Sequence, residues 1–184
     1  MKKIIFTLIV FLFSIAAFAQ KYLPEIKAGT TITSNASVQG QQIPLLLTIN
    51  SITDGVSLGW AVEGYGEGSF KMSNKAMESG NKMFMTTQPA FGETKLADDE
   101  TFGFISKSSF KSLLENKSFN YNGLKFKLKT SIATAPKING KEADAINVVS
   151  EDGKYEFWVL NHPSFPLIIQ SSGLTPDIII SEIK

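Results

Sequence analysis

Several residue types that serve catalysis or nucleic-acid binding are absent or scarce in this 184-residue chain. It contains no cysteine, which excludes disulfide bonds, thiol catalysis and thiolate zinc sites. All 18 basic residues are lysine, so the planar group that pairs with phosphate and stacks on bases is missing. A single histidine, His162, is too few for a histidine-based zinc site. We therefore expect no nucleic-acid partner and no cofactor.

The charge balance gives no attraction for partners of one sign. The chain has 18 basic and 17 acidic residues, and loss of Lys2 and Lys3 with the N-terminal segment would change the net charge from +1 to about −1. Nucleic acids and acidic membrane surfaces are usually bound by strongly basic proteins. The composition favours neither partner.

The longest hydrophobic run lies at the N-terminus. Two lysines precede an apolar stretch that ends in Ala17-Phe18-Ala19, a pattern typical of a cleavage site. The pattern predicts a signal peptide over residues 1–19 and a mature chain that begins at Gln20. The stretch is shorter than the ~20 apolar residues of a membrane-spanning helix. We expect a periplasmic or secreted protein that does not span the membrane.

After Gln20, apolar residues recur mainly at every second position, which is typical of half-buried strands. In 56–62 (VSLGWAV) they alternate with small residues, and in 124–130 (LKFKLKT) they alternate with lysines that we expect on the solvent side. Four denser segments are expected to be covered at least partly on both faces: 43–49 (IPLLLTI), 154–160 (KYEFWVL), 165–171 (FPLIIQS) and 177–183 (DIIISEI).

Turn signals favour antiparallel pairing of these strands. Four dipeptides suited to tight hairpin turns lie between strand-like runs: Asp54-Gly55, Asn122-Gly123, Asn139-Gly140 and Asp152-Gly153. Helix signals are limited to 106–116 (SKSSFKSLLEN) and 73–80. A parallel doubly wound fold is not favoured, because strands do not alternate with long helices. The sequence predicts one mainly β domain, residues 20–184, with a curved antiparallel sheet, a half-barrel or open barrel, and one or two short helices.

The segment Trp60–Met77 (WAVEGYGEGSFKMSNKAM) places Gly64, Gly66 and Gly68 at alternate positions. A phosphate loop would lead directly into a helix, and the dinucleotide fingerprint has another glycine spacing. Alternate glycines in a strand share one face and leave it bare. Two interpretations stay open: sheet curvature or close packing of the 73–80 turn, or a ligand lying against the bare strip.

Methionine and aromatic residues also indicate a ligand site. Four methionines are close in sequence between 72 and 85, and most of the 14 phenylalanines follow the N-terminal segment. Such residues fill cores and also line adaptable apolar ligand sites. The candidate ligand-binding residues are Trp60, Gly64, Gly66, Gly68, Met72, Met83 and Met85.

Catalytic and metal-binding signals are weak. Asp98, Asp99 and Glu100 form a compact acidic cluster and a candidate for weak calcium binding, but they lack the spaced ligands of a calcium loop. His162 lies in the turn-like segment NHPSFP, and no Gly-x-Ser-x-Gly motif accompanies it. We expect no catalytic residues; a hydrolase acting through Asp98, Asp99 or His162 is the least favoured alternative.

The segments FAQ (18–20), YLPEIKAGT (22–30) and YEFWVLNHPSFPLIIQ (155–170) resemble exported Bacteroidota proteins of unknown function. The late order of a Trp-bearing strand, a Pro-containing turn and an apolar strand also resembles periplasmic half-barrel domains, an architecture that includes lipoprotein carriers. This resemblance implies a curved antiparallel sheet whose apolar concave face is closed by short helices. The carriers use arginine near their ligand, which this chain lacks, so lipoprotein carriage is not implied.

Together these features favour an exported, non-catalytic binding module for an apolar or amphipathic ligand, with an apolar small molecule or lipid as its partner. The alternative is a structural or protein-interaction domain of the envelope. Such a domain would join an envelope protein through exposed strand edges.

Overall fold

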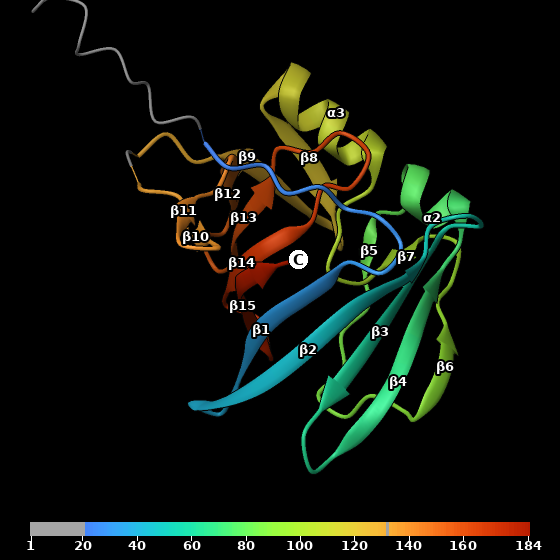
Figure 1. The fold of residues 1–184 in the computed structure, drawn as a ribbon. Helices are drawn as coiled ribbons and strands as arrows, with labels where there is room; N and C mark the ends of the chain where they lie inside the picture. The colour runs from blue at the N-terminus through green and yellow to red at the C-terminus, as the bar shows by residue number, and fades with distance from the viewer. Residues whose placement is uncertain (1–20, 132) are drawn as a thin grey trace, which may run out of the picture.

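The computed structural model describes residues 21–131 and 133–184 (Figure 1). The expected signal peptide, residues 1–19, lies outside the described residues. Most of the described strands belong to one large sheet, and the longer of the two helices, α3 (Lys107–Asn116), lies beside its β8 end (Figure 1).

The large sheet has eleven strands in the order β6-β4-β3-β2-β1-β15-β14-β13-β12-β9-β8. Their bounds are β1 Thr31–Val38, β2 Gln41–Ser51, β3 Val56–Val62, β4 Gly66–Met72, β6 Gly92–Lys95, β8 Ser118–Tyr121, β9 Leu124–Leu128, β12 Ala145–Ser150, β13 Glu156–Leu160, β14 Ile168–Ser172 and β15 Asp177–Ile183. Two small sheets pair β5 (Lys82–Met83) with β7 (Glu100–Thr101) and β10 (Lys137–Ile138) with β11 (Lys141–Glu142).

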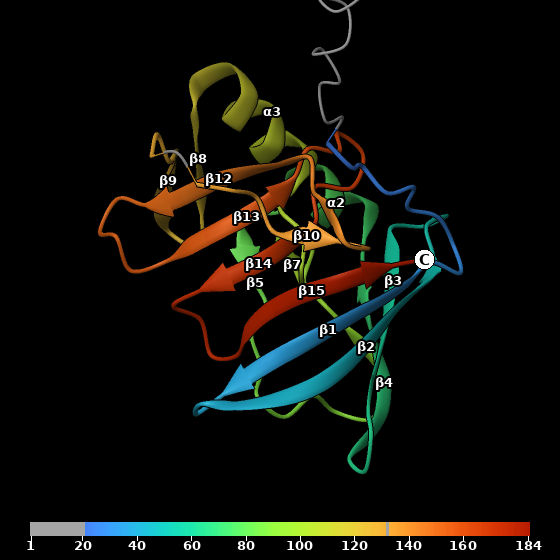
Figure 2. The ribbon, with the colours of Figure 1, turned by 60° about the vertical axis from the view of Figure 1, so that its left-hand side comes forward.

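The expected mainly β fold with short helices is confirmed. Neighbouring strands of the large sheet are antiparallel except β4 and β6, which are parallel. The sheet ends at β6 and β8, so it is open and not a closed barrel. Figure 2 shows β14, β15, β1 and β2 side by side, with β3 and β4 turned to a different direction.

The hairpin predictions match the turns. Asn122 and Gly123 have φ angles of 54° and 74° between β8 and β9, and the Asn139-Gly140 pair has 54° and 75° between β10 and β11. Asn and Gly tolerate this left-handed conformation, which two-residue hairpin turns require. Segment 56–62 matches β3, and Phe126 in β9 is buried between exposed lysines at 125 and 127, as its alternating pattern predicts.

The expected coverage of both sheet faces is wrong for β2 and β15. In β2 the burial alternates, and Leu46 is 45% exposed while Leu47 is 2% exposed. In β15, Ile179 is 44% exposed while Ile180 is buried. Dense apolar sequence led to the error, because a sheet open to solvent on one side can keep isolated apolar residues on that side.

Both predicted helices are present and capped by serine. α2 (Asn74–Ser79) begins after Ser73, whose Oγ accepts a 3.1 Å hydrogen bond from the Ala76 amide. α3 begins after the buried Ser106, whose Oγ accepts from the Ser109 amide. Serine at this position satisfies an amide at the start of a helix that otherwise has no partner.

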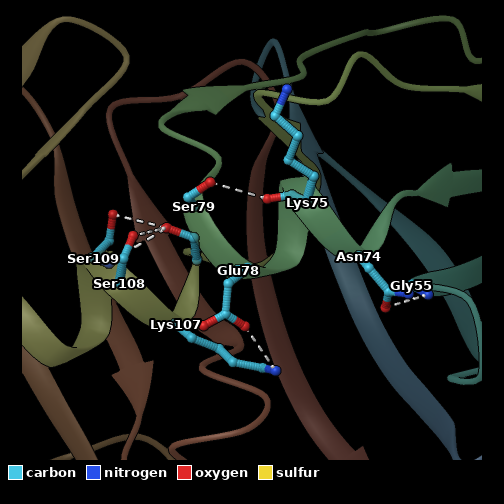
Figure 3. Close-up of polar contacts among 9 residues, drawn as sticks. Gly55, Asn74, Lys75, Glu78, Ser79, Lys107, Ser108 and Ser109 are labelled. Carbon is cyan, nitrogen blue, oxygen red and sulfur yellow. Dashed lines mark hydrogen bonds and ion pairs between the residues drawn. The ribbon is translucent and has the colours of Figure 1, made fainter.

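Polar contacts fix α2 against its surroundings (Figure 3). The Lys107 ammonium at the start of α3 lies 3.1 Å from the Glu78 carboxylate of α2. The Asn74 side chain accepts a 2.8 Å hydrogen bond from the Gly55 amide, in the turn that joins β2 to β3. These contacts join α2 to α3 on one side and to the sheet on the other.

The segment between α2 and α3 crosses one face of the sheet, which we call the inner face. Phe70 of β4 lies on this face, and its ring centroid is 5.4 Å from that of Phe84 and 4.4 Å from that of Phe102. Phe104 forms an isolated β-bridge with Leu167, next to β14. Residues 84–89 and 102–104, which we call the covering segment, therefore cover the inner face of strands that belong to both halves of the sheet. Residues 92–95, which lie between them in the chain, form the edge strand β6 of the same sheet.

A buried polar cluster anchors the end of this covering segment. The Tyr121 hydroxyl donates to the Phe104 carbonyl at 3.0 Å and lies 2.7 Å from Thr101 Oγ1, which also donates to the Phe104 carbonyl. Both side chains are fully buried. Burial raises the pKa of Tyr121 far above its usual range, so its hydroxyl stays protonated.

Candidate functional site

An apolar cavity of about 180 Å³ lies between the inner face and the covering segment. Its walls come from five strands, the β3–β4 and β14–β15 turns and the covering segment: Ala36, Val38, Ile43, Leu45, Leu47, Trp60, Val62, Tyr65, Phe70, Thr86, Thr87, Pro89, Phe102, Pro176 and Ile178. Strand alternation explains the wall, because Ile43, Leu45 and Leu47 of β2 lie on the same face as Trp60 and Val62 of β3.

Three aromatic side chains form a cluster beside the cavity, which we call the aromatic cluster: Trp60, Tyr65 and Phe91. The centroid distances are 6.1 Å for Trp60–Tyr65, 6.4 Å for Trp60–Phe91 and 5.5 Å for Tyr65–Phe91. Trp60 is 3% exposed, Tyr65 45% and Phe91 67%. The cluster thus runs from the cavity wall to the solvent. An exposed phenylalanine beside an apolar cavity is a typical feature of a binding surface.

The structure answers the question of the glycines. Gly68 pairs with Trp60, and a side chain at Gly68 would lie 2.9 Å from the indole and 2.7 Å from the Gly92 carbonyl. At Gly66, whose φ is 145°, a side chain would meet the Phe91 ring. Gly66 and Gly68 therefore leave room for the rings of the aromatic cluster, and the 73–80 turn does not fill it.

Gly64 departs from the predicted strip. It lies in the turn between β3 and β4 with a φ of 75°, and a side chain there would meet no atom within 4 Å. Strand alternation would place Tyr65 on the face opposite the glycines, but its ring contacts Trp60 and Phe91. The two-residue period fails here because the chain turns before Gly66.

A second, smaller cavity of about 40 Å³ adjoins the first. The two cavities share four wall residues, Thr86, Phe102, Pro176 and Ile178. Met83 and Met85 line the smaller one, and Met85 is 42% exposed. Met72 is fully buried in the core, where its sulfur accepts a hydrogen bond from the Phe102 amide. Of the predicted residues, Trp60, Met83 and Met85 line the two cavities, and Gly66 and Gly68 support the aromatic cluster.

Two wider hollows, of about 660 and 560 Å³, lie on the opposite face of the sheet. They share Leu46, Ala61 and Glu67, which form one row across β2, β3 and β4. Both hollows are shallow and open to solvent. The inner cavity of about 180 Å³ is the better candidate, because apolar side chains would surround most of a ligand there.

The acidic cluster is engaged by lysines. Asp98 accepts a 2.8 Å hydrogen bond from Ser73 Oγ, and Asp99 lies 2.7 Å from the Lys82 ammonium. The hydrogen bond from Lys82 lowers the pKa of Asp99. Within 21–131 and 133–184, no group of three or more His, Asp or Glu residues is arranged to hold a metal ion. This arrangement favours a solvated loop over a calcium site.

His162 lies in the loop after β13, away from the groups that a hydrolase would require. Its Nδ1 accepts a 3.2 Å hydrogen bond from the Phe165 amide, and its ring packs against Phe165. Partial burial lowers its pKa, so it is neutral at pH 7. No hydrogen bond or ion pair joins it to Asp98 or Asp99, whose partners are Ser73 and lysines.

Charged side chains do not contribute to the two cavities. Among the described residues that line them, none is Lys, Asp, Glu or His. The polar side-chain groups of the cavity walls are hydroxyls.

The least exposed ion pair lies away from these cavities. It joins Lys129 to Glu156 at 2.7 Å, and Asn147 donates a 2.9 Å hydrogen bond to the same carboxylate. The hydrogen bond from Lys129, followed by that from Asn147, lowers the pKa of Glu156.

Sequence reasoning identified only Trp60 among the residues that line the larger cavity, and three of the residues that it missed illustrate why. Phe91 and Phe102 fall between the two predicted helices, where the sequence predicts no strand. Ile178 falls in a strand that was expected to be covered at least partly on both faces. The alternation of β15 contains a signal for Ile178, because Ile178 and Ile180 share a face. For Phe91 the local sequence holds no such signal, since its contacts depend on where the covering segment lies.

No family model, curated protein or solved structure matches this chain. Among the described residues, no helix combines the length and apolar character needed to cross a membrane.

Proposed function

We propose that the protein is an exported, non-catalytic binding module for an apolar or amphipathic ligand held in the inner cavity. The observation that supports this most strongly is the partly enclosed cavity, whose walls are almost entirely aliphatic and aromatic. Enclosed apolar space beside a partly exposed aromatic cluster suits a ligand with an apolar part to bury.

The proposal includes export. The resemblance to exported Bacteroidota proteins and the signal-peptide pattern support removal of residues 1–19. The mass of the chain recovered from the periplasm or medium of an expressing bacterium tests this. The mass of a chain that begins at Gln20 is expected. Recovery of the chain from the cytoplasm with residues 1–19 still attached would contradict export.

The binding test uses two matched variants. Ala36 lies in the cavity wall and is 7% exposed, whereas Ala61 lies on the opposite face. Ala36→Leu adds three carbon atoms. If each takes the ~30 Å³ that a water molecule occupies, together they fill about half of the 180 Å³ cavity. Ala61→Leu makes the same change outside it.

Trp60 serves as the reporter in a Trp158→Phe background, because the chain has two tryptophans and Trp60 lines the cavity. Toluene and 1-hexanol are titrated into residues 20–184 while indole emission is recorded. Saturable changes in the parent and in Ala61→Leu, with at least tenfold weaker binding in Ala36→Leu, are expected. Absence of a response to every neutral apolar compound would contradict the proposal.

The second candidate, an envelope interaction domain, has one observation in its favour. β6 is an edge strand of the sheet, and three of its four residues are exposed. An unpaired edge is a template for a strand from another chain. The Leu96 amide donates to the Lys71 carbonyl of β4, so the amide of Lys95 points to the free edge. A stoichiometric protein partner that purifies with the parent and is lost in Lys95→Pro would favour this function over ligand binding.

A further inference from the structure

We propose that the two inner cavities form one site for an uncharged, unbranched aliphatic chain of about seven carbon atoms. This inference rests on the proposed function and specifies its ligand. The proposed chain enters beside the aromatic cluster, passes beneath Thr86 and Phe102, and ends against Met83 and Met85.

Adjacency of the cavities supports an elongated ligand. Four residues belong to both walls, so only the side chains of these residues separate the two cavities: Thr86, Phe102, Pro176 and Ile178. The second cavity, about 40 Å³, is too small for a ring, since a cavity of about 150 Å³ holds one benzene molecule. A flexible chain can pass through such a constriction, whereas a rigid ring system would stop in the first cavity.

The volumes set the length of the chain. The first cavity measures about 180 Å³ and the second about 40 Å³. If one methylene group takes roughly the ~30 Å³ of a water molecule, together they hold about seven carbon atoms. Met83 and Met85 at the far end are flexible side chains that adapt to the end of a chain.

The chemistry of the walls favours an uncharged ligand. No lysine lines either cavity, so a carboxylate would have no charged partner there. Burying an unpaired charge is far more costly than burying a hydroxyl, and the Thr86 and Thr87 hydroxyls offer hydrogen bonds to an alcohol or ester.

The test is a chain-length series of 1-butanol, 1-hexanol, 1-octanol and 1-decanol, with octanoate as the charged analogue of octanol. Binding to residues 20–184 is measured by calorimetry and by Trp60 emission in the Trp158→Phe background. Affinity is expected to rise about fourfold per methylene up to the chain that fills the site, then to level off. Octanoate is expected to bind at least tenfold more weakly than octanol.

A matched pair of variants locates the chain. Ile178 lies at the junction of the cavities, and its neighbour Ile179 is 44% exposed on the opposite face. In Ile178→Phe the affinity is expected to level off at a chain shorter by about two carbons, whereas Ile179→Phe keeps the parent profile. If Ile178→Phe does not fold, the alcohol series on the parent protein still tests whether the site takes an aliphatic chain of limited length.

Failure of this inference is distinguishable from failure of the proposed function. Tighter binding of toluene or naphthalene than of octanol, equal binding of octanoate, or affinity that keeps rising through decanol would overturn the aliphatic-chain inference and retain an apolar site. Absence of binding by every neutral compound would overturn both.

Discussion

Replacement of Gly68 by alanine tests the central packing relation of the aromatic cluster. A methyl group there would lie 2.7 Å from the Gly92 carbonyl and 2.9 Å from two atoms of the Trp60 indole. Gly92 is held beside Gly68 by the parallel pairing of β4 and β6, so its carbonyl cannot move without a shift of the strand. The Trp60 N–H has no hydrogen-bond partner among the described residues, so packing alone positions the ring.

The magnitude follows from two opposing terms. Overpacking of a well-packed site costs about 1–3 kcal/mol of unfolding free energy. Alanine also restricts the unfolded chain more than glycine does, which raises the free energy of unfolding by about 0.4–1 kcal/mol. The difference of the two ranges is about 0–2.6 kcal/mol, so we expect Gly68→Ala to lower the free energy of unfolding by about 1.3 kcal/mol, the midpoint. Trp60 emission is expected to shift to longer wavelength as the ring becomes more exposed.

Gly59→Ala is the matched control on the neighbouring strand. A methyl group there would meet only the end of the Asn50 side chain, at 2.9 Å, and Asn50 is exposed and free to rotate. Its expected effect lies between zero and a stabilisation of about 1 kcal/mol. The assay is urea denaturation followed by Trp60 emission in the Trp158→Phe background. Equal stability of the two variants would refute the packing argument.

Three further predictions concern the framework of the fold. Tyr121→Phe is expected to lower the unfolding free energy by about 1 kcal/mol at pH 7. Because the pKa of Tyr121 is raised in the folded state, the unfolding free energy of the parent falls above about pH 10 by up to ~1.4 kcal/mol per pH unit. The variant lacks this fall, because it has no hydroxyl at this position. Identical dependence of the unfolding free energy on pH in parent and variant above pH 10 would contradict the burial of Tyr121. Because Lys129 lowers the folded pKa of Glu156, their interaction contributes stability above about pH 4.5 that is lost on acidification. Glu156→Gln should therefore narrow the difference in unfolding free energy between pH 6 and pH 3, measured by urea denaturation, by at most ~1 kcal/mol for a pair about one-third exposed. An unchanged difference would argue against the pair. Ser106→Ala removes the cap of α3 and should cost about 1 kcal/mol in thermal or urea unfolding, and no loss would mean that the α3 amides find other partners.

Local pattern was sufficient for much of the fold. The alternation of 56–62 matches β3, the serine caps place both helices, and the Asn-Gly pairs place two hairpins. By contrast β1 was not predicted, because its sequence TITSNASV is mostly polar. Ser34 is buried there only because its hydroxyl donates to the Leu45 carbonyl of the neighbouring strand, a contact that sequence alone does not reveal.

The candidate site was predictable only in part. Trp60, Met83 and Met85 were found from residue type, and all three line the inner cavities. Gly64 was assigned to a strand face because the start of the turn could not be read from alternating glycines. Phe91 reaches the aromatic cluster through the path of the covering segment, and long-range placement of this kind depends on the whole fold.

Native mass spectrometry of residues 20–184, recovered after export and compared before and after organic extraction, tests the binding function most directly. We expect the parent and Ala61→Leu to carry a discrete extra mass that extraction removes, and Ala36→Leu to carry less of it. Extraction then identifies the ligand, and an uncharged aliphatic compound is expected. An unliganded mass for all three proteins, together with no response of Trp60 to any neutral apolar compound, would contradict the account and direct the search to protein partners at the β6 edge.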